Sequence, residues 1–171
     1  ESGNQAETVT CLDASDGKIL WQTGYGKPWT GQYPASRCTP TFSNGEIFVS
    51  SGSGNVAKLA ADSGKLLWSF NAMERFQGSF GGWGIAESLL VDERAVYFTP
   101  GGKQTTIVAL DRRDGKTLWK SKALGEKTSY VSPTEIRHGG IRQIVAATTN
   151  YVFGVDPATG NMVWSSPFGK I

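Results

Sequence analysis

Short apolar runs, most of them alternating with polar residues, recur along the whole chain and are separated by clusters of Gly, Asn, Asp and Ser. Such alternation is typical of half-buried β-strands, and such clusters are typical of tight turns. The longest apolar stretches are about six residues, well short of the roughly 18 that a membrane-spanning helix needs. The pattern predicts an all-β domain of many short antiparallel strands, with no membrane span.

One ten-residue phrase recurs four times along the chain. The copies are LDASDGKILW from Leu12, LAADSGKLLW from Leu59, LDRRDGKTLW from Leu110 and VDPATGNMVW from Val155. Their tryptophans are 47, 51 and 45 residues apart (68−21, 119−68 and 164−119). Repeats of roughly 40 to 50 residues are typical of β-propeller blades. The repeat therefore predicts a propeller of four-stranded antiparallel blades.

The Asp, Gly and Trp of the phrase each have an expected structural role. The Asp, at Asp13, Asp111 and Asp156, is expected to cap a tight turn, and the Gly supplies the positive φ that a three-residue hairpin with a bulge requires. A buried Trp covers roughly 150 to 250 Å². We expect the phrase to close the last hairpin of each blade and its tryptophans to fasten neighbouring blades. The residues with these structural roles are Gly17, Trp21, Gly64, Trp68, Gly115, Trp119, Gly160 and Trp164.

The remaining strands are placed outward from the phrases. The first two strands of the three complete blades are expected at 38–42 and 47–50, at 87–91 and 96–99, and at 132–137 and 144–148. This divides the chain into a partial blade of two strands at 1–25 and blades at 26–74, 75–123 and 124–171. About 3.5 blades leave strand edges open. We therefore expect a fragment of a seven- or eight-bladed propeller that self-associates through its exposed blade edges.

Charge and cysteine content remove several classes of function. Seventeen basic and fifteen acidic residues give a net charge of +2, and they are scattered, so neither nucleic acid nor a membrane surface is an expected partner. Cys11 and Cys38 are expected to be free, buried and small hydrophobic residues. The single histidine, His138, cannot complete a metal site with them. No metal site is predicted.

The phrase, with its Asp, Gly, Lys and closing Trp, resembles the tryptophan docking motif of the quinoprotein, or PQQ-like, β-propeller repeat family. Residues 82–88 (GWGIAES), 99–103 (TPGGK) and 108–111 (VALD) are similar to the same family. The resemblance implies an exported bacterial protein, periplasmic or otherwise extracytoplasmic, and generally eight blades. The family contains PQQ-dependent dehydrogenases and also a cofactor-free scaffold that helps to assemble outer-membrane proteins. It is therefore specific for fold and weak for function.

A quinoprotein dehydrogenase of this family requires adjacent cysteines, a Trp below the cofactor, and Glu, Asn and Asp around Ca²⁺. This chain has no adjacent cysteines; Trp83, Glu87 and Asn150 are the right residue types but match no family position one by one. We therefore expect a non-catalytic extracytoplasmic binding or scaffold module without a cofactor. Two alternatives remain: a PQQ- and calcium-dependent alcohol or sugar dehydrogenase whose active-site residues lie partly outside this segment, and a carbohydrate-binding propeller.

Long links between blades carry the candidate binding face. They run over 23–37, 71–86 and 121–131 and, in a propeller, share one face with the middle loops of the blades. Aromatic residues on such loops suit a protein or glycan ligand, although they equally suit local packing over the blade ends. The candidate residues are Tyr25, Trp29, Tyr33, Arg75, Phe76, Phe80, Trp83, Glu87 and Tyr130.

Overall fold

The computed structural model describes residues 6–168, which form fourteen strands and one short helix. The elements are β1 Glu7–Leu12, β2 Ile19–Gly26, β3 Thr41–Ser43, β4 Glu46–Ser50, β5 Asn55–Ala60, β6 Leu66–Asn71, α1 Ala72–Phe76, β7 Leu90–Val91, β8 Ala95–Phe98, β9 Val108–Asp111, β10 Thr117–Lys120, β11 Thr134–His138, β12 Ile141–Ala147, β13 Tyr151–Val155 and β14 Met162–Pro167.

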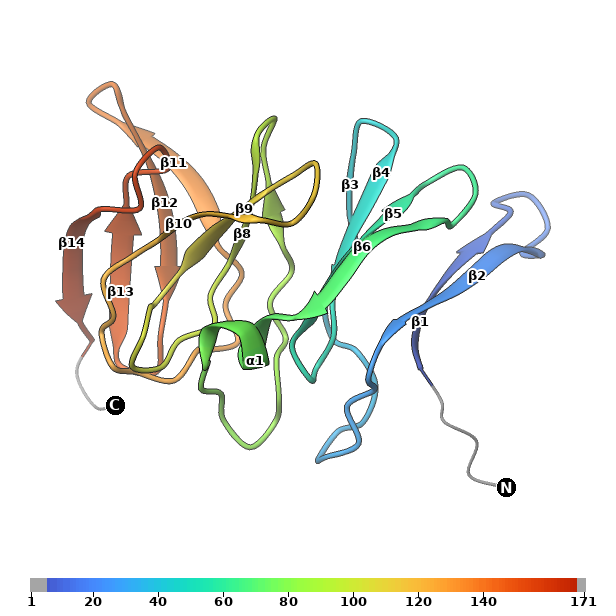
Figure 1. Cartoon of the computed structure of the whole chain (residues 1–171), viewed down its shortest axis with the longest axis horizontal. Helices are drawn as coiled ribbons and strands as arrows, with labels where there is room; N and C mark the ends of the chain where they lie inside the picture. The colour runs from blue at the N-terminus through green and yellow to red at the C-terminus, as the bar shows by residue number, and fades with distance from the viewer. Residues whose placement is uncertain (1–5, 169–171) are drawn as a thin grey trace.

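The strands make one two-stranded sheet and three four-stranded sheets, and each sheet pairs its strands antiparallel in chain order. The sheets stand side by side as a fan, with β1 and β2 at one end and β11 to β14 at the other (Figure 1). The first and last hairpin turns of the blades lie along one side of the fan, and the middle turns and the links between blades lie along the opposite side (Figure 1). The predicted propeller of about 3.5 antiparallel blades is confirmed.

The hairpins of the four phrases are built as the sequence predicts. Gly17, Gly64, Gly115 and Gly160 have φ of +73°, +67°, +70° and +74°. A register shift beside each turn marks the bulge. The aspartates cap these turns: the Oδ1 of Asp13, Asp111 and Asp156 each accepts a bond from the backbone N–H two residues later, at 2.7 to 2.8 Å.

The innermost strands begin later than predicted. β3 starts at Thr41 instead of residue 38, β7 at Leu90 instead of 87, and β11 at Thr134 instead of 132. The preceding backbone bonds to side chains of the next blade: the N–H of Thr39 donates to Ser88 Oγ (2.8 Å) and that of Ser88 donates to Ser132 Oγ (3.0 Å). Because these N–H groups donate to side chains of the next blade, they form no hydrogen bonds with the adjacent strand of their own sheet.

Helix α1 lies in a segment that the sequence assigned to an irregular link. Its N-cap is Asn71, whose side chain accepts from the N–H of Glu74 at 3.0 Å, and Gln77 ends it in the left-handed conformation. Met73 and Phe76 face the core. One five-residue turn is too short to show helical periodicity, which explains the omission. α1 is also too short and too polar to cross a membrane, and the described residues contain no other helix.

The apolar core lies between neighbouring sheets. Phe48 and Val56 of the second sheet pack with Phe98 and Leu110 of the third, and the third and fourth sheets meet in the same way through Tyr97 and Phe153. Each junction also takes one phrase tryptophan along its edge, since Trp21, Trp68 and Trp119 contact the three core clusters. The fan is therefore held together by sheet faces.

The two cysteines fit only part of the prediction. Cys11 and Cys38 are free thiols, but both are half-buried rather than buried. Cys38 lies beside the carbonyl of Ile85, with Sγ 3.9 Å from the oxygen, and burial raises the pKa of its thiol. The thiol is therefore protonated at neutral pH, and it packs as a small residue against the start of the third blade.

Candidate functional site

Three aromatic side chains from three successive links form an exposed row, which we call the aromatic row: Tyr33, Trp83 and Tyr130. The rings of Tyr33 and Trp83 are 6.1 Å apart edge to face, and those of Trp83 and Tyr130 are 5.5 Å apart at 32°. Their exposed fractions are 68%, 48% and 43%. Because each residue comes from a different link, the row crosses the fan from blade to blade.

Polar contacts hold the central residue of the row in place. The Nε1 of Trp83 donates to Gln32 Oε1 at 2.9 Å, and the guanidinium of Arg37 donates to the Trp83 carbonyl. Gly81 gives the Tyr130 hydroxyl room, because a Cβ at residue 81 would lie 2.8 Å from that oxygen. The indole is thus fixed in orientation while much of its ring stays open to solvent.

Trp29 and Phe80 are not members of the exposed aromatic row. Both are half-buried, with their rings 5.8 Å apart edge to face. A Cβ on Gly52 would lie 2.6 Å from the Trp29 Cβ, and a Cβ on Gly84 would lie 2.9 Å from the Cδ2 of its indole. The Trp29 Nε1 donates to the carbonyl of Gln32 at 2.9 Å. Trp29 therefore packs the links onto the blades.

Three of the nine candidate face residues are buried and offer no contact surface. Tyr25 donates through its hydroxyl to the Ser50 carbonyl at 3.1 Å, and burial raises its pKa. Phe76 belongs to the core between the second and third blades. Glu87, the third, is fully buried. The sequence placed Tyr25 in a link, whereas it lies near the end of β2, and the sequence could not show which way each side chain turns.

Arg75 is exposed, but its side chain bonds to the neighbouring blade. Its guanidinium donates to the carbonyl of Gly115 (2.9 Å) and to Thr117 Oγ1 (3.0 Å), and it covers the ring of Phe70 at 4.5 Å. These contacts join α1 to the last hairpin of the third blade. The residue is therefore placed outside the aromatic row.

Glu87 forms a buried carboxyl site between the second and third blades. Both of its carboxylate oxygens accept from the Thr99 N–H, at 3.0 and 3.2 Å, and its carbonyl accepts from Ser50 Oγ at 2.5 Å. Burial raises the pKa of Glu87 to about 8, against the weaker lowering by the Thr99 bond. The carboxyl group is therefore protonated at neutral pH.

The residues described do not fit PQQ and calcium. A calcium ion needs several charged or carbonyl oxygens together, whereas Glu87 is enclosed and neutral, and Asn150 is exposed and donates to Glu126 Oε2 at 2.7 Å. Between residues 6 and 168, no three His, Cys, Asp or Glu side chains gather as a metal site. Trp83 packs edge to face with Tyr33 and at a tilt with Tyr130. The dehydrogenase alternative finds no built site in this part of the chain.

A second set of sequence-selected residues meets at the blade junctions. The indole of Trp21 lies over Gly64, that of Trp68 over Gly115 and that of Trp119 over Gly160. Each Nε1 donates to a carbonyl of the same turn, at 3.1, 3.3 and 3.0 Å. Trp164 and Gly17, at the two ends of the fan, have no such neighbour among the described residues.

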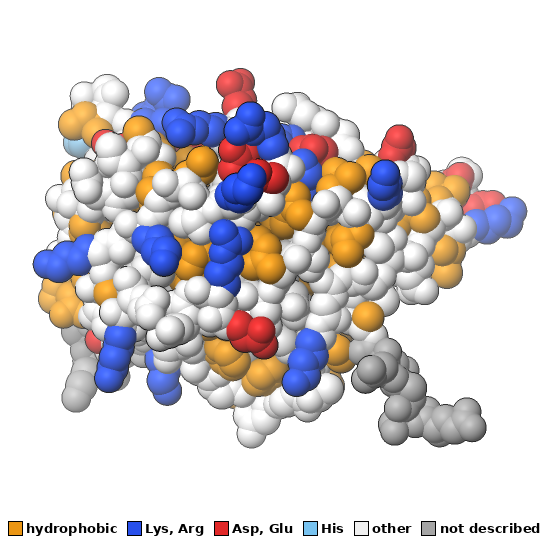
Figure 2. Space-filling model, in the orientation of Figure 1, with side chains coloured by type: hydrophobic (Ala, Val, Ile, Leu, Met, Phe, Trp, Pro, Cys, Tyr) orange, Lys and Arg blue, Asp and Glu red, His pale blue; other side chains and the backbone are white. Residues whose placement is uncertain are grey.

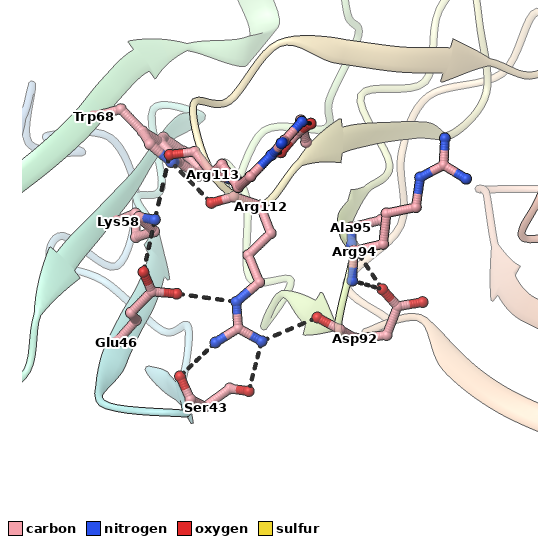
Figure 3. A network of polar contacts seen from close by, with 10 residues as sticks. Ser43, Glu46, Lys58, Trp68, Asp92, Arg94, Ala95, Arg112 and Arg113 are labelled. Atoms are coloured by element: carbon pink, nitrogen blue, oxygen red, sulfur yellow. Dashed lines mark hydrogen bonds and ion pairs between the residues drawn. The ribbon is translucent and has the colours of Figure 1, made fainter.

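The turn side of the fan carries a polar junction that sequence reasoning missed. Arg112, buried in the last turn of the third blade, donates to Glu46 Oε2 (2.9 Å) and to the hydroxyl and carbonyl of Ser43 (3.0 and 2.6 Å) in the second blade (Figure 3). It also reaches the carbonyl of Asp92 at 3.1 Å. Lys58 binds the other oxygen of Glu46 at 2.7 Å. These contacts tie two blades together.

Charged side chains gather along this same edge, over the hairpin turns (Figure 2). Among them, Arg142 of the fourth blade joins Asp92 of the third (2.5 Å) and Glu135 (2.9 Å). Burial alone would raise the pKa of Asp92, but its bonds from Arg142 and from two backbone N–H groups lower it. The carboxylates of Glu46, Asp92 and Glu135 are therefore paired within the fan.

Comparison with known proteins places the chain in a family. The family model described as outer membrane protein assembly factor BamB matches residues 5–170. Among curated relatives, BamB of Nitrosomonas eutropha is 24% identical over 95% of this chain and 34% of its own length. Tetrathionate hydrolase of Acidithiobacillus ferrooxidans is 23% identical over 95% of this chain and 32% of its own. The chain spans about a third of the length of these relatives.

Solved structures agree on the fold. BamB from Moraxella catarrhalis superimposes with a TM-score of 0.66 at 22% identity, covering 97% of this chain and 45% of that one. Quinohemoprotein alcohol dehydrogenase from Comamonas testosteroni gives 0.69 at 16% identity, covering 96% and 33%. The BamB and the alcohol dehydrogenase structures thus share the fold of these blades. The chain belongs to the PQQ-like repeat family of β-propellers that the outer membrane protein assembly factor BamB model describes.

Proposed function

We propose that this chain is part of a non-catalytic, extracytoplasmic scaffold that binds a protein partner through the aromatic row. The observation that carries the proposal is the row itself: Trp83 packs with both Tyr33 and Tyr130, and the three residues come from three different links and remain exposed. Membership of the BamB family supports a role in assembling outer-membrane proteins, and with it a location outside the cytoplasm.

The chemistry of the row suits an extended protein segment. Tyr and Trp supply large contact areas with few rotatable bonds, and they are enriched among the residues that dominate protein interfaces. Trp83 is already oriented by Gln32 and Arg37, so little side-chain freedom is lost on binding. The amide and guanidinium beside the rings give a polar rim that can bond to a peptide backbone.

Two other ligands remain as competing outcomes of the test. A glycan also stacks on exposed aromatic rings, and the tilt of only 32° between Trp83 and Tyr130 gives it a nearly continuous platform. PQQ with Ca²⁺ is the ligand of the dehydrogenase branch, and the residues described here do not hold it. The partner protein is favoured because the family model that covers the chain is that of an assembly factor.

Three titrations separate these readings. The probes are extended peptides taken from the strands of outer-membrane β-barrel proteins, a set of oligosaccharides, and PQQ with Ca²⁺ followed by absorbance. We expect saturable binding of at least one peptide and none of the other two probes. Stoichiometric PQQ binding, or oligosaccharide binding without peptide binding, contradicts the proposal.

We further propose that the open ends of the fan allow self-association. β1 and β14 are edge strands among the described residues, and their sheets lie at opposite ends (Figure 1). Open strand edges and uncovered sheet faces favour pairing with another chain. This contact uses surfaces separate from the aromatic row, so the two proposals can be tested independently.

A further inference from the structure

The second and third blades meet around a space that an arginine fills. The guanidinium carbon of Arg112 lies 5.2 Å from the centre of the Phe48 ring, and Arg112 Nε donates to Glu46 Oε2 at 2.9 Å. Arg112 is buried, so its planar head group closes the turn side of this junction.

The equivalent positions of the next junction carry small residues. Strand β8 begins with Ala95, where β4 begins with Glu46. The phrase residue three positions before the glycine is Arg112 in the third blade and Pro157 in the fourth. Because neither Ala95 nor Pro157 has a side chain long enough to cross to the neighbouring blade, the space that Arg112 fills in one junction stays open in the next.

The open space is a hollow of about 410 Å³ between the third and fourth blades, which we call the junction hollow. Volumes of roughly 300 to 1,000 Å³ are typical of small-molecule sites. All of its lining residues lie between positions 92 and 158, in two blades that the chain contains whole. Its apolar walls are formed by Ala95, Leu118, Trp119, Ile141 and Pro157.

Three of the four charged side chains that line the junction hollow already have partners. Asp92 Oδ2 accepts from Arg142 at 2.5 Å and from the Tyr97 hydroxyl at 2.8 Å. Asp156 accepts from backbone N–H groups of its own turn, at 2.7 and 3.3 Å. Both carboxylates are therefore bonded within the fan, and a cationic ligand would have to displace one of these bonds.

Arg94 is the fourth charged residue of the lining. Its backbone N–H donates to Asp92 Oδ1 at 2.9 Å, but its side chain turns away from that carboxylate (Figure 3). Its guanidinium makes no hydrogen bond or ion pair within residues 6–168, and the nearby Asp111 is paired with Arg113 at 2.8 Å instead. In this part of the chain, the junction hollow thus combines apolar walls with one cation that has no counter-charge.

We propose that the junction hollow binds an aromatic carboxylate, with the ring against the apolar walls and the carboxylate paired with Arg94. A guanidinium can meet a carboxylate through two parallel N–H···O bonds, which are stronger than bonds between neutral groups. A flat ligand is favoured because the same space in the preceding junction holds a planar guanidinium against Phe48. The hollow lies among the hairpin turns, whereas the aromatic row lies on the links, so this site is separate from the proposed protein-binding surface (Figure 1).

The test is calorimetric titration of the 171-residue chain with cinnamate, a flat aromatic carboxylate, and with cinnamamide, its uncharged analogue. Cinnamate should bind saturably at one site, and cinnamamide about tenfold more weakly or worse. Arg94→Gln should weaken cinnamate to the level of the amide and leave the amide unchanged. Arg113→Gln is the matched control, because it removes the same charge from a largely exposed side chain outside the lining, and it should bind both compounds like the wild type.

A second variant closes the hollow. Ala95→Glu together with Pro157→Arg transplants the pair that fills the preceding junction, and it should abolish cinnamate binding without lowering the midpoint of urea unfolding. Arg94 has an exposed side chain, so the Arg94→Gln result decides the question even if the double variant does not fold.

Trp83→Ala should bind cinnamate like the wild type, because Trp83 lies in the aromatic row. Lost binding in this variant would place the compound on the row and overturn the proposal. A wild type without saturable binding, equal affinity for cinnamate and cinnamamide, or full binding by Arg94→Gln or by the folded double variant would overturn it as well.

Discussion

The indole of Trp21 occupies the place that a side chain on Gly64 would need. Its Cδ2 and Cε3 atoms are each 2.5 Å from the position of a Gly64 Cβ, and its Nε1 donates to the Ala61 carbonyl of the same turn at 3.1 Å. Gly64 also has a φ of +67°. Two separate constraints thus favour glycine at this position of the phrase: its positive φ and its contact with the tryptophan of the preceding blade.

Comparing Gly64→Ala with a matched control should separate the energetic costs of these two constraints. A positive φ alone costs an alanine about 1 to 2 kcal/mol, and overpacking against the indole should add about 1 to 3 kcal/mol. Gly45→Ala is the matched control, because Gly45 has a φ of +74° with nothing within 4 Å. Urea unfolding of both variants measures the difference. Equal losses of unfolding free energy would show that the Trp21 contact is not a constraint on Gly64.

Arg112 should be the most important charged residue of the blade junctions. Its guanidinium is buried on Glu46 and Ser43, and removing one partner from a buried ion network costs about 3 kcal/mol or more. We expect Arg112→Met to lower the midpoint of urea unfolding strongly. Arg112→Lys should recover only part of the loss, because an ammonium cannot reproduce the forked bonds.

The control for that series is the adjacent arginine. Arg113 pairs with Asp111 but has a largely exposed side chain, so Arg113→Met should leave the unfolding midpoint almost unchanged. A similar effect of both methionine variants would mean that net charge at this edge, rather than the junction, sets the stability.

Replacement by alanine should destabilise the chain much more at Trp29 than at Trp83. Trp29 is packed against Gly52 and Gly84, and its loss should cost about 3 kcal/mol of unfolding free energy. Trp83 is half exposed, so its loss should cost about 1 kcal/mol or less. Thermal or urea unfolding of the two variants provides the measurement. A large loss at residue 83 would reassign the aromatic row to packing.

Glu87 should make stability depend on pH. Burial raises the pKa of Glu87 to about 8 in the folded chain, from the ordinary glutamate value of 4.5. Between these values the unfolded chain has released the proton and the folded chain keeps it, so unfolding becomes easier as pH rises, by about 1.4 kcal/mol per pH unit. This loss of stability is absent below pH 4.5 and complete above pH 8.

Glu87→Gln keeps the shape and removes the ionisable group. The unfolding free energy of the variant should rise relative to that of the wild type as the pH of the urea series is raised from 5 to 8. The difference between the two proteins should reach its acid limit near pH 4. Glu93→Gln, at an exposed turn position, should keep the wild-type dependence. A difference between Glu87→Gln and wild type that is the same at every pH would refute a protonated buried carboxyl.

The parts of the fold that the sequence predicted are local ones. The phrase hairpins follow from residues within ten positions of each other, so Gly17, Gly64, Gly115 and Gly160 indicate them directly. The late start of β3 and β7 follows instead from bonds of Thr39 to Ser88 and of Ser88 to Ser132, partners more than forty residues apart. No periodicity in the sequence reports such contacts.

The candidate site was predicted to the level of segments and no further. The sequence placed Tyr25 and Tyr33 in one link, but Tyr25 lies near the end of β2 and is buried on Ser50, whereas Tyr33 lies in the link and is exposed beside Trp83. Arg112 occupies the phrase position that is Ala61 in one blade and Pro157 in another, and only the neighbouring blade gives it Glu46. Burial and pairing of this kind depend on tertiary contacts, which turn chemistry and alternation do not encode.

The affinity of the chain for an extended peptide from an outer-membrane β-barrel strand, compared between Trp83→Ala and Phe42→Ala, tests the proposed function most directly. Phe42 is an aromatic residue on β3, outside the aromatic row, and is more exposed than Trp83 (68% against 48%). If the row is the binding surface, Trp83→Ala should weaken binding at least tenfold, about 1.4 kcal/mol, while Phe42→Ala leaves the dissociation constant unchanged. Equal affinities for both variants and the wild type would contradict it.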